Sequence, residues 1–285
     1  MIYNVLTIAG TDPSGGAGIS ADLKTFSALG AYGTVVITAV VAQNTHGVAA
    51  VHQLSGEVVS QQLQTLFADV RIDAVKIGML GDAEVVRAVA SALERHHPPY
   101  VVLDPVMVAK SGDRLLAPEA VQALREQLLP RSDLITPNLP EAADLLGEQQ
   151  ARDEDTMHDQ LGRLAGLTRG VLLKGGHLPG TDCVDLLLID GRRTRLSAPR
   201  IATTSTHGTG CTLSAAIAAL RPQRPDWDSA VSEAKNYLTG AIAAADQLQV
   251  GSGHGPTHHF HATWCRPSGD RVGIGTAPGI DDRSR

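Results

Sequence analysis

Short apolar runs alternate with longer helix-like segments, and this alternation constrains the possible folds more than any other feature. The expected strands are Asn4–Ala9, Thr34–Ala42, Ala74–Ile77, Tyr100–Leu103, Leu134–Thr136 and Val171–Lys174, with Cys183–Ile189 and Thr194–Ala198 as a hairpin. The expected helices are Ile19–Leu29, Glu57–Asp69, Asp82–Arg95, Pro118–Leu129, Leu139–Leu146, Cys211–Leu220 and Trp227–Leu248. Helices between apolar strands build βαβ units, so the sequence predicts an α/β fold around a mostly parallel sheet. Val48–Leu54 alternates less regularly, and we expect it to form a strand outside that sheet.

The chain is long enough for one large domain or two small ones, with 285 residues. Neither an internal repeat nor a linker interrupts residues 1–263, which we interpret as a single domain. From Arg266 the composition becomes rich in Gly and Arg, with few large aliphatic residues. We therefore expect residues 266–285 to be a disordered tail.

Composition argues against several classes of partner. The net charge is −6 and aromatic residues make up only 3 % of the chain, so we expect no nucleic-acid partner. Since no apolar run approaches the roughly 18 residues of a membrane-spanning helix, we expect no membrane partner either. The N-terminus lacks signal-peptide features, and the three cysteines form no Cys-x-x-Cys pair. A cytoplasmic protein is the simplest interpretation.

A glycine-rich loop, residues 10–18, lies between the first predicted strand and helix. Such loops let a backbone approach a ligand at a helix N-terminus, although a plain tight turn is an alternative. The loop is not a P-loop, because Gly15 is followed by Gly16 and Ala17 rather than by Lys and Ser or Thr. A dinucleotide fingerprint is disfavoured too, because residues 23–56 contain no acid to bind a ribose.

Polar side chains at residues 43–47 follow the second predicted strand. The amides of Gln43 and Asn44 can both donate and accept hydrogen bonds, which suits a neutral heteroaromatic or amide ligand. Ordinary turn chemistry is the alternative interpretation.

Asp104 ends another predicted strand, and Asn138 and Glu141 follow the next. Asn138 and Glu141 are three residues apart, so they share one face of a helix start. Their oxygens could hold Mg²⁺ directly or through water. Alternatively, Glu141 is an acid that favours the helix macrodipole.

Thr206–Cys211 precedes a strong alanine-rich helix pattern. Gly208, Thr209 and Gly210 would place several backbone N–H groups at its N-terminus, which is an anion site suited to a transferring phosphoryl group. We expect the helix dipole and a nearby Lys to lower the pKa of the Cys211 thiol, so that it could accept a proton; an inert buried Cys is the alternative. Lys174, at the end of a strand, is a candidate phosphate contact.

In this order along the chain, the clusters resemble the hydroxymethylpyrimidine/phosphomethylpyrimidine kinases of thiamine biosynthesis, within the ribokinase-like superfamily. The resemblance extends from about residue 4 to Trp264 and depends on the motifs at residues 10–18, 43–45, 76–80, 104–107, 136–141, 174–177 and 207–214. It implies a three-layer αβα fold with a small edge element, a homodimer, and two successive phosphorylations that use ATP with Mg²⁺.

The resemblance also implies roles for particular residues. Cys211 matches the position of the catalytic base, where related sugar and pyridoxal kinases carry Asp, and this favours a pyrimidine substrate. The resemblance implies that Gly210 and Lys174 are catalytic as well. The substrate pocket corresponds to Gln43, Gly10, Asp22, Met79 and Val106. Phosphate and ATP contacts correspond to Lys174, Gly208, Thr209, Gly210 and Asn138, and the Mg²⁺ environment corresponds to Asp104 and Glu141.

Two other functions remain open. A pyridoxal or pyridoxine kinase would act on a similar ring and hydroxymethyl group. A non-catalytic pyrimidine-binding sensor would not need Lys174, Glu141 and Cys211. Near the C-terminus, His258, His259 and His261 could bind Zn²⁺, but no accompanying metal motif supports this, and we expect structural or surface roles.

Overall fold

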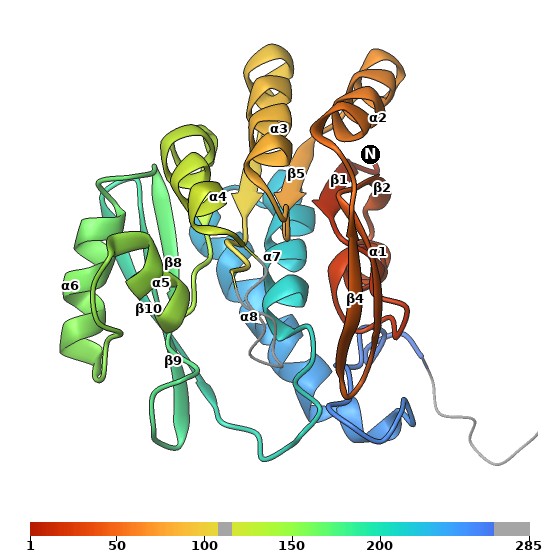
Figure 1. Ribbon diagram of the computed structural model, residues 1–285. Coiled ribbons are helices and arrows are strands. Elements are labelled where there is room, and N and C mark those ends of the chain that lie inside the picture. The colour runs from red at the N-terminus through yellow and green to blue at the C-terminus, as the bar shows by residue number, and fades with distance from the viewer. Residues whose placement is uncertain (108–115, 265–285) are drawn as a thin grey trace, which may run out of the picture.

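An eight-stranded sheet runs through the middle of the computed structural model, which describes residues 1–107 and 116–264 (Figure 1). Its strand order is β10-β9-β8-β7-β6-β5-β1-β2, and only β9 runs against its neighbours. The strands are β1 (Asn4–Ala9), β2 (Tyr32–Ile37), β5 (Ala74–Ile77), β6 (Val101–Leu103), β7 (Leu134–Ile135), β8 (Gly170–Lys174), β9 (Asp182–Ile189) and β10 (Arg192–Pro199). The prediction of a mostly parallel sheet is confirmed.

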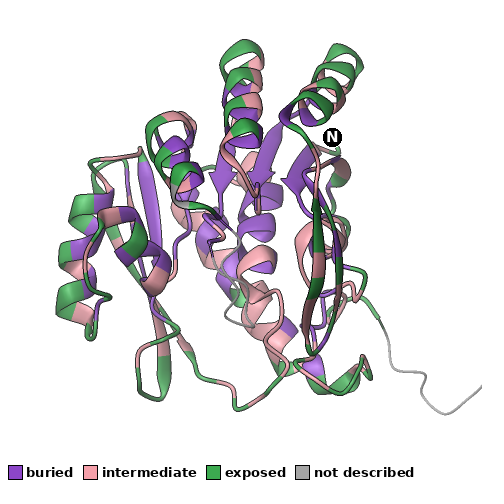
Figure 2. Cartoon of the chain, in the orientation of Figure 1, coloured by how far each residue is buried: buried purple, intermediate pink, exposed green. Residues whose placement is uncertain are grey.

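Helices cover both faces of this sheet. One face carries α2 (Gly56–Asp69), α3 (Ala83–His96), α4 (Pro118–Ala123), α5 (Leu139–Leu146) and α6 (Glu154–Leu164), and the other carries α1 (Gly18–Ala28), α7 (Thr209–Leu220) and α8 (Trp227–Ala243). Alternate residues of the central strands enter the two cores. Leu6 and Ile8 of β1, for example, pack against the first set of helices, while Val5 packs against the second. The five central strands are accordingly buried on both sides, while β2 and β10 at the sheet edges are more exposed (Figure 2).

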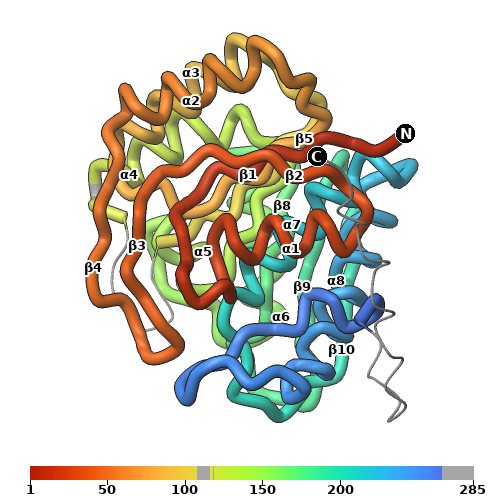
Figure 3. The backbone as a smooth tube through the Cα atoms, turned by 90° about the vertical axis from the view of Figure 1, so that its right-hand side faces the viewer, coloured from red at the N-terminus to blue at the C-terminus, as the bar shows by residue number. Residues whose placement is uncertain are grey.

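A separate two-stranded sheet, the β3–β4 hairpin, runs beside the main sheet (Figure 3). It consists of β3 (Ala39–Asn44) and β4 (Gly47–Gln53), which confirms a strand outside the main sheet at residues 48–54. The single strand expected at Thr34–Ala42 is wrong, because the chain leaves the sheet at Thr38. The backbone N–H of Thr38 still bonds to Ala9, while its hydroxyl donates to the Met79 carbonyl at 2.7 Å.

Three helix predictions need correction. Helix α6 was not predicted, because its buried face has only Met157, Leu161 and Leu164 as large apolar residues. The helix expected at Pro118–Leu129 is α-helical only to Ala123 and continues as a π-helical turn and a 3₁₀ turn to Arg131. The last helix ends at Ala243 instead of Leu248, and a 3₁₀ turn follows it.

Two further expectations concern the chain as a whole. Within the described residues, none of the helices combines the length and the apolar character needed to cross a bilayer. The tail predicted at residues 266–285 lies outside the described residues.

A buried ion pair fastens α8 to β9. Lys235 Nζ donates to Asp185 Oδ2 at 2.6 Å and to the Cys183 carbonyl at 3.0 Å, while the other Asp185 oxygen accepts from the Gly175 backbone at 3.1 Å. Both charged side chains are at most 9 % exposed. Such a pair is costly to break on one side, because the remaining charge stays desolvated.

Lys235→Met should therefore lower the free energy of unfolding by about 3–5 kcal/mol. Arg131→Met is the control, since it removes a more exposed pair with Glu94 and should cost at most about 1 kcal/mol. Urea unfolding followed by circular dichroism measures both, and equal losses would contradict the expectation.

Candidate active site

A cavity of about 780 Å³ opens at the carboxyl ends of the parallel strands. Its walls are the segments that follow β1, β5, β6, β7 and β8, together with the β3–β4 hairpin and the N-terminus of α7. Open α/β sheets bind their ligands at this edge. The loops that the sequence analysis singled out therefore meet in one place.

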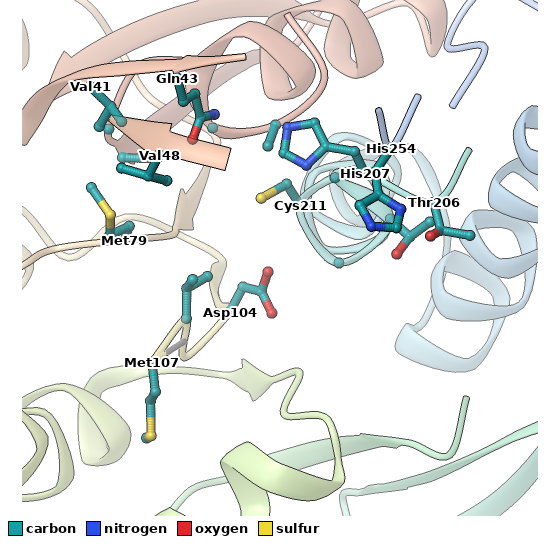
Figure 4. Close-up of a pocket in the computed structure, with 18 of the residues that line it drawn as sticks. Val41, Gln43, Val48, Met79, Asp104, Met107, Thr206, His207, Cys211 and His254 are labelled. Atoms are coloured by element: carbon teal, nitrogen blue, oxygen red, sulfur yellow. The ribbon is translucent and has the colours of Figure 1, made fainter. Parts of the chain in front are cut away.

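Almost all of the predicted site residues line this cavity. They are Gly10, Gln43, Met79, Asp104, Val106, Asn138, Glu141, Lys174, Gly208, Thr209, Gly210 and Cys211. In Figure 4 the Cys211 sulfur points from α7 into the cavity and faces the side on which Gln43, Val48 and Met79 lie. Asp104 lies on another wall.

Asp22 is the exception, because it does not belong to the cavity lining. Its side chain is fully buried, and its Oδ2 accepts hydrogen bonds from Thr7 Oγ1 at 2.6 Å and from Lys76 Nζ at 2.8 Å. The expected place of Asp22 in the substrate pocket is corrected accordingly: it supports Lys76, which does line the cavity.

Lys76 lines the cavity but was not predicted to be functional from the sequence. It is fully buried, and neighbouring Asp22 raises its pKa despite the opposing effect of burial. The sequence did mark Lys76 as unusual, because it is the one charged residue in the four-residue strand β5. Charged residues are almost never fully buried unless they are paired. Asp12, His207 and His254 also escaped notice, and the two histidines line the cavity.

Asp104 joins four elements at the floor of the cavity. Its Oδ1 accepts from Thr136 Oγ1 at 3.0 Å and from Lys174 Nζ at 2.9 Å. Its Oδ2 is 3.4 Å from the Ser214 hydroxyl of α7. These bonds hold Lys174 over the site, where Asp104 and Glu141 outweigh burial and raise the pKa of Lys174.

Glu141 both caps α5 and faces the cavity. Its backbone N–H donates to Asn138 Oδ1 at 2.9 Å, and its Oε2 accepts from the Asn138 backbone at 2.8 Å, which forms a capping box. Burial raises the pKa of the Glu141 carboxyl to about 7, with Lys174 opposing this shift and Asp104 adding to it. Glu141 can therefore cap α5 and face the cavity at the same time.

The N-terminus of α7 supplies backbone donors to the cavity. Gly208 is the N-cap, with φ at 76°, and a Cβ added there would lie 1.7 Å from the Gly16 carbonyl oxygen. The first helical bond runs from Thr212 to Gly208, so the N–H groups of Thr209, Gly210 and Cys211 precede the intrahelical ladder. This geometry can bind an anion.

The expected lowering of the Cys211 pKa is wrong. Burial raises the pKa of the thiol to about 11, and nearby Asp22 and Asp104 add to this effect. Lys76 opposes the shift but does not overcome it. The helix start and a lysine were visible in the sequence, whereas the desolvation of the sulfur depends on tertiary packing.

The C-terminal histidines are packed into the protein. His259 Nε2 lies 3.2 Å from Thr212 Oγ1, and burial lowers the pKa of His259 to about 4. His258 is also buried and meets Trp264 edge-on. Among residues 1–107 and 116–264, no group of three or more His, Cys, Asp or Glu side chains could hold a metal ion.

The family model and the curated relatives point to one family. The model of the phosphomethylpyrimidine kinase family matches residues 12–258. The hydroxymethylpyrimidine/phosphomethylpyrimidine kinase of Salmonella typhimurium is 59 % identical over 263 residues, which cover 92 % of this chain and 98 % of that relative.

Two solved structures are similar over most of their length. Phosphomethylpyrimidine kinase from Clostridium difficile is 42 % identical with a TM-score of 0.75, and the match covers 84 % of this chain and 99 % of that one. An ADP complex of Bacillus subtilis pyridoxal kinase is 36 % identical with a TM-score of 0.84, and the match covers 91 % and 98 % of the two chains.

The raised thiol pKa has a measurable consequence. Alkylation requires the thiolate, so the rate at Cys211 should rise about tenfold per pH unit from pH 7.5 to 9.5 without a plateau. Free cysteine, with a pKa of about 8.5, should level off over the same range. Iodoacetamide labelling of Cys211, followed by mass spectrometry, measures the rate, and a plateau below pH 9 would contradict the expectation.

Proposed function

The chain belongs to the phosphomethylpyrimidine kinase family, and we propose that it phosphorylates 4-amino-5-hydroxymethyl-2-methylpyrimidine in two ATP-dependent steps. The first step makes the monophosphate and the second makes the diphosphate, for thiamine biosynthesis. The observation that carries the proposal is the convergence of an amide, a thiol and a helix N-terminus in one cavity, at Gln43, Cys211 and Gly208–Gly210.

The acceptor ring fits the end of the cavity formed by the β3–β4 hairpin. Gln43 offers a donor and an acceptor to the polar edge of a pyrimidine, while Val41, Met79 and Val106 offer apolar contact. A Cβ at Gly10 would lie 2.6 Å from Met79 Cε, so glycine leaves room for Met79 beside the first loop.

The transferring phosphoryl group fits the N-terminus of α7. The backbone donors of residues 209–211 and the ammonium group of Lys174 are close together, because a Cβ on Gly210 would be 3.3 Å from Lys174 Nζ. Phosphoryl transfer depends mainly on alignment and on neutralising spreading charge, and this arrangement supplies both.

We assign the Mg²⁺ environment to Asp104 and Glu141. Their carboxylate oxygens suit a hard cation. The raised pKa of Glu141, caused by burial and by Asp104, indicates a place where added positive charge would be favourable. When bound there, the ion would neutralise charge on the ATP phosphates.

Cys211 lies where it can act on the acceptor hydroxyl. With a pKa of about 11 the thiol is protonated at neutral pH, so it must lose its own proton before it accepts one from the substrate. Lys76 favours the thiolate and is the side chain that most opposes the effect of burial. Because the transition state is loose, we expect proton removal to contribute less than the anion site does.

On the same resemblance, we propose that the chain acts as a homodimer in the cytoplasm.

The deciding experiment incubates purified protein with Mg·ATP and the hydroxymethylpyrimidine, and follows both products by chromatography and mass spectrometry. We expect the monophosphate first and then the diphosphate. A parallel assay with pyridoxal tests the second candidate, which the similarity to a pyridoxal kinase keeps in view. Turnover of pyridoxal alone would favour that candidate, and binding of the pyrimidine without ATP consumption would favour a sensor.

A pair of variants separates the anion site from the thiol. Gly210→Asp places a carboxylate beside Lys174 and Asp104, since a Cβ at this position would lie 3.4 Å from Asp104 Oδ2. The added negative charge in the anion site should lower kcat by at least about 10³-fold. Cys211→Ser should lower kcat by about 10²-fold. Gly210→Ala is the control for added volume alone. Steady-state rates in which Cys211→Ser is the more damaging change would contradict this order.

A further inference from the structure

A buried carboxylate outside the assigned machinery holds the first glycine loop in shape. Asp12 is 2 % exposed, and its Oδ2 accepts from the backbone of Gly16 at 3.1 Å and of Ala17 at 2.7 Å. Its Oδ1 accepts from both the backbone and the hydroxyl of Ser14, at 2.8 and 2.7 Å. Burial acts to raise the pKa of Asp12, but hydrogen bonds from His207, Ser14 and Gln43 outweigh it, so the carboxylate is ionised.

The same carboxylate reaches a residue 195 positions away in the chain. His207 Nε2 lies 2.8 Å from Asp12 Oδ2, and His207 directly precedes Gly208, the N-cap of α7. The His207 backbone N–H donates to the Gly255 carbonyl at 3.0 Å, which fixes the residue from its other side. His207 is thus held at both its side chain and its backbone.

The two glycine loops are in direct contact at this point. A Cβ on Gly16 would lie 2.5 Å from the His207 ring, and a Cβ on Gly208 would lie 1.7 Å from the Gly16 carbonyl. The two loops therefore pack closely against each other, with the Gly208 backbone against the Gly16 carbonyl.

We propose that His207, held by Asp12, is a positioning residue that keeps the N-terminus of α7 aligned with the acceptor end of the cavity. The catalytic consequence rests on the proposed function, whereas the mechanical connection between the two loops does not. An error of about 1 Å in the alignment of reacting groups can cost about 10²-fold in rate. Because the pair acts by holding the loops in position, a neutral side chain that donates an N–H to Asp12 over a similar distance should substitute for the His207 imidazole.

The kinetic test compares three histidine variants. His207→Ala should lower kcat by about 30- to 100-fold, while the KM for the pyrimidine changes less than about threefold, because Gln43 remains in place. His207→Gln retains an N–H donor of similar reach and should return kcat to within about threefold of the unchanged protein. His52→Gln, on the exposed part of β4, is the control. Failure of the Gln variant to restore the rate, or an Ala variant that affects only KM, overturns the proposal.

A second measurement does not depend on turnover. Amide hydrogen exchange of the full chain should show faster exchange in both residues 10–18 and residues 206–214 for His207→Ala, and normal exchange for His207→Gln. In a double-mutant cycle with Asp12→Asn, the effects on exchange should be non-additive, because the two side chains share one bond. Faster exchange confined to residues 206–214, or additive effects, would refute the connection. If the variants show this exchange pattern but the unchanged protein phosphorylates nothing, the proposed function fails and the positioning pair stands.

Discussion

The carboxylate of Asp104 is the contact on which the site depends. It follows β6 and accepts hydrogen bonds from Thr136 after β7 and from Lys174 at the end of β8, while Ser214 of α7 approaches its second oxygen. Three neighbouring strand ends and one helix are thereby fixed around one buried negative charge. The protein tolerates this deeply buried carboxylate because it is paired with Lys174 and hydrogen-bonded.

A second buried pair also lies close enough to Cys211 to influence its thiol. Lys76 and Asp22 come from β5 and α1, and both are fully buried. Together the two lysine–carboxylate pairs make the base of the cavity polar while the strands around it keep apolar cores on both faces. The arrangement places fixed charges beside the proposed phosphate site.

The sequence predicted the regular elements best where local pattern and packing agree. Helix α5 was predicted residue for residue, because an Asn–Glu capping box marks its start and a glycine its end. The strand expected at Thr34–Ala42 failed, because the inner face of β3 is as apolar as a strand of the main sheet, and periodicity cannot show where the chain leaves that sheet. Helix α6 was missed because its buried face is narrow and the rest of it is polar.

By itself the sequence determined the α/β architecture and the loops that carry the chemistry, because strand and helix periods and glycine-rich turns are local properties of the chain. The tertiary structure alone decided that these loops share one cavity, that Asp22 supports Lys76 instead of lining the pocket, and that the Cys211 thiol has a raised pKa. Desolvation and charge pairing depend on which distant groups surround an atom, and spacing along the chain does not encode them.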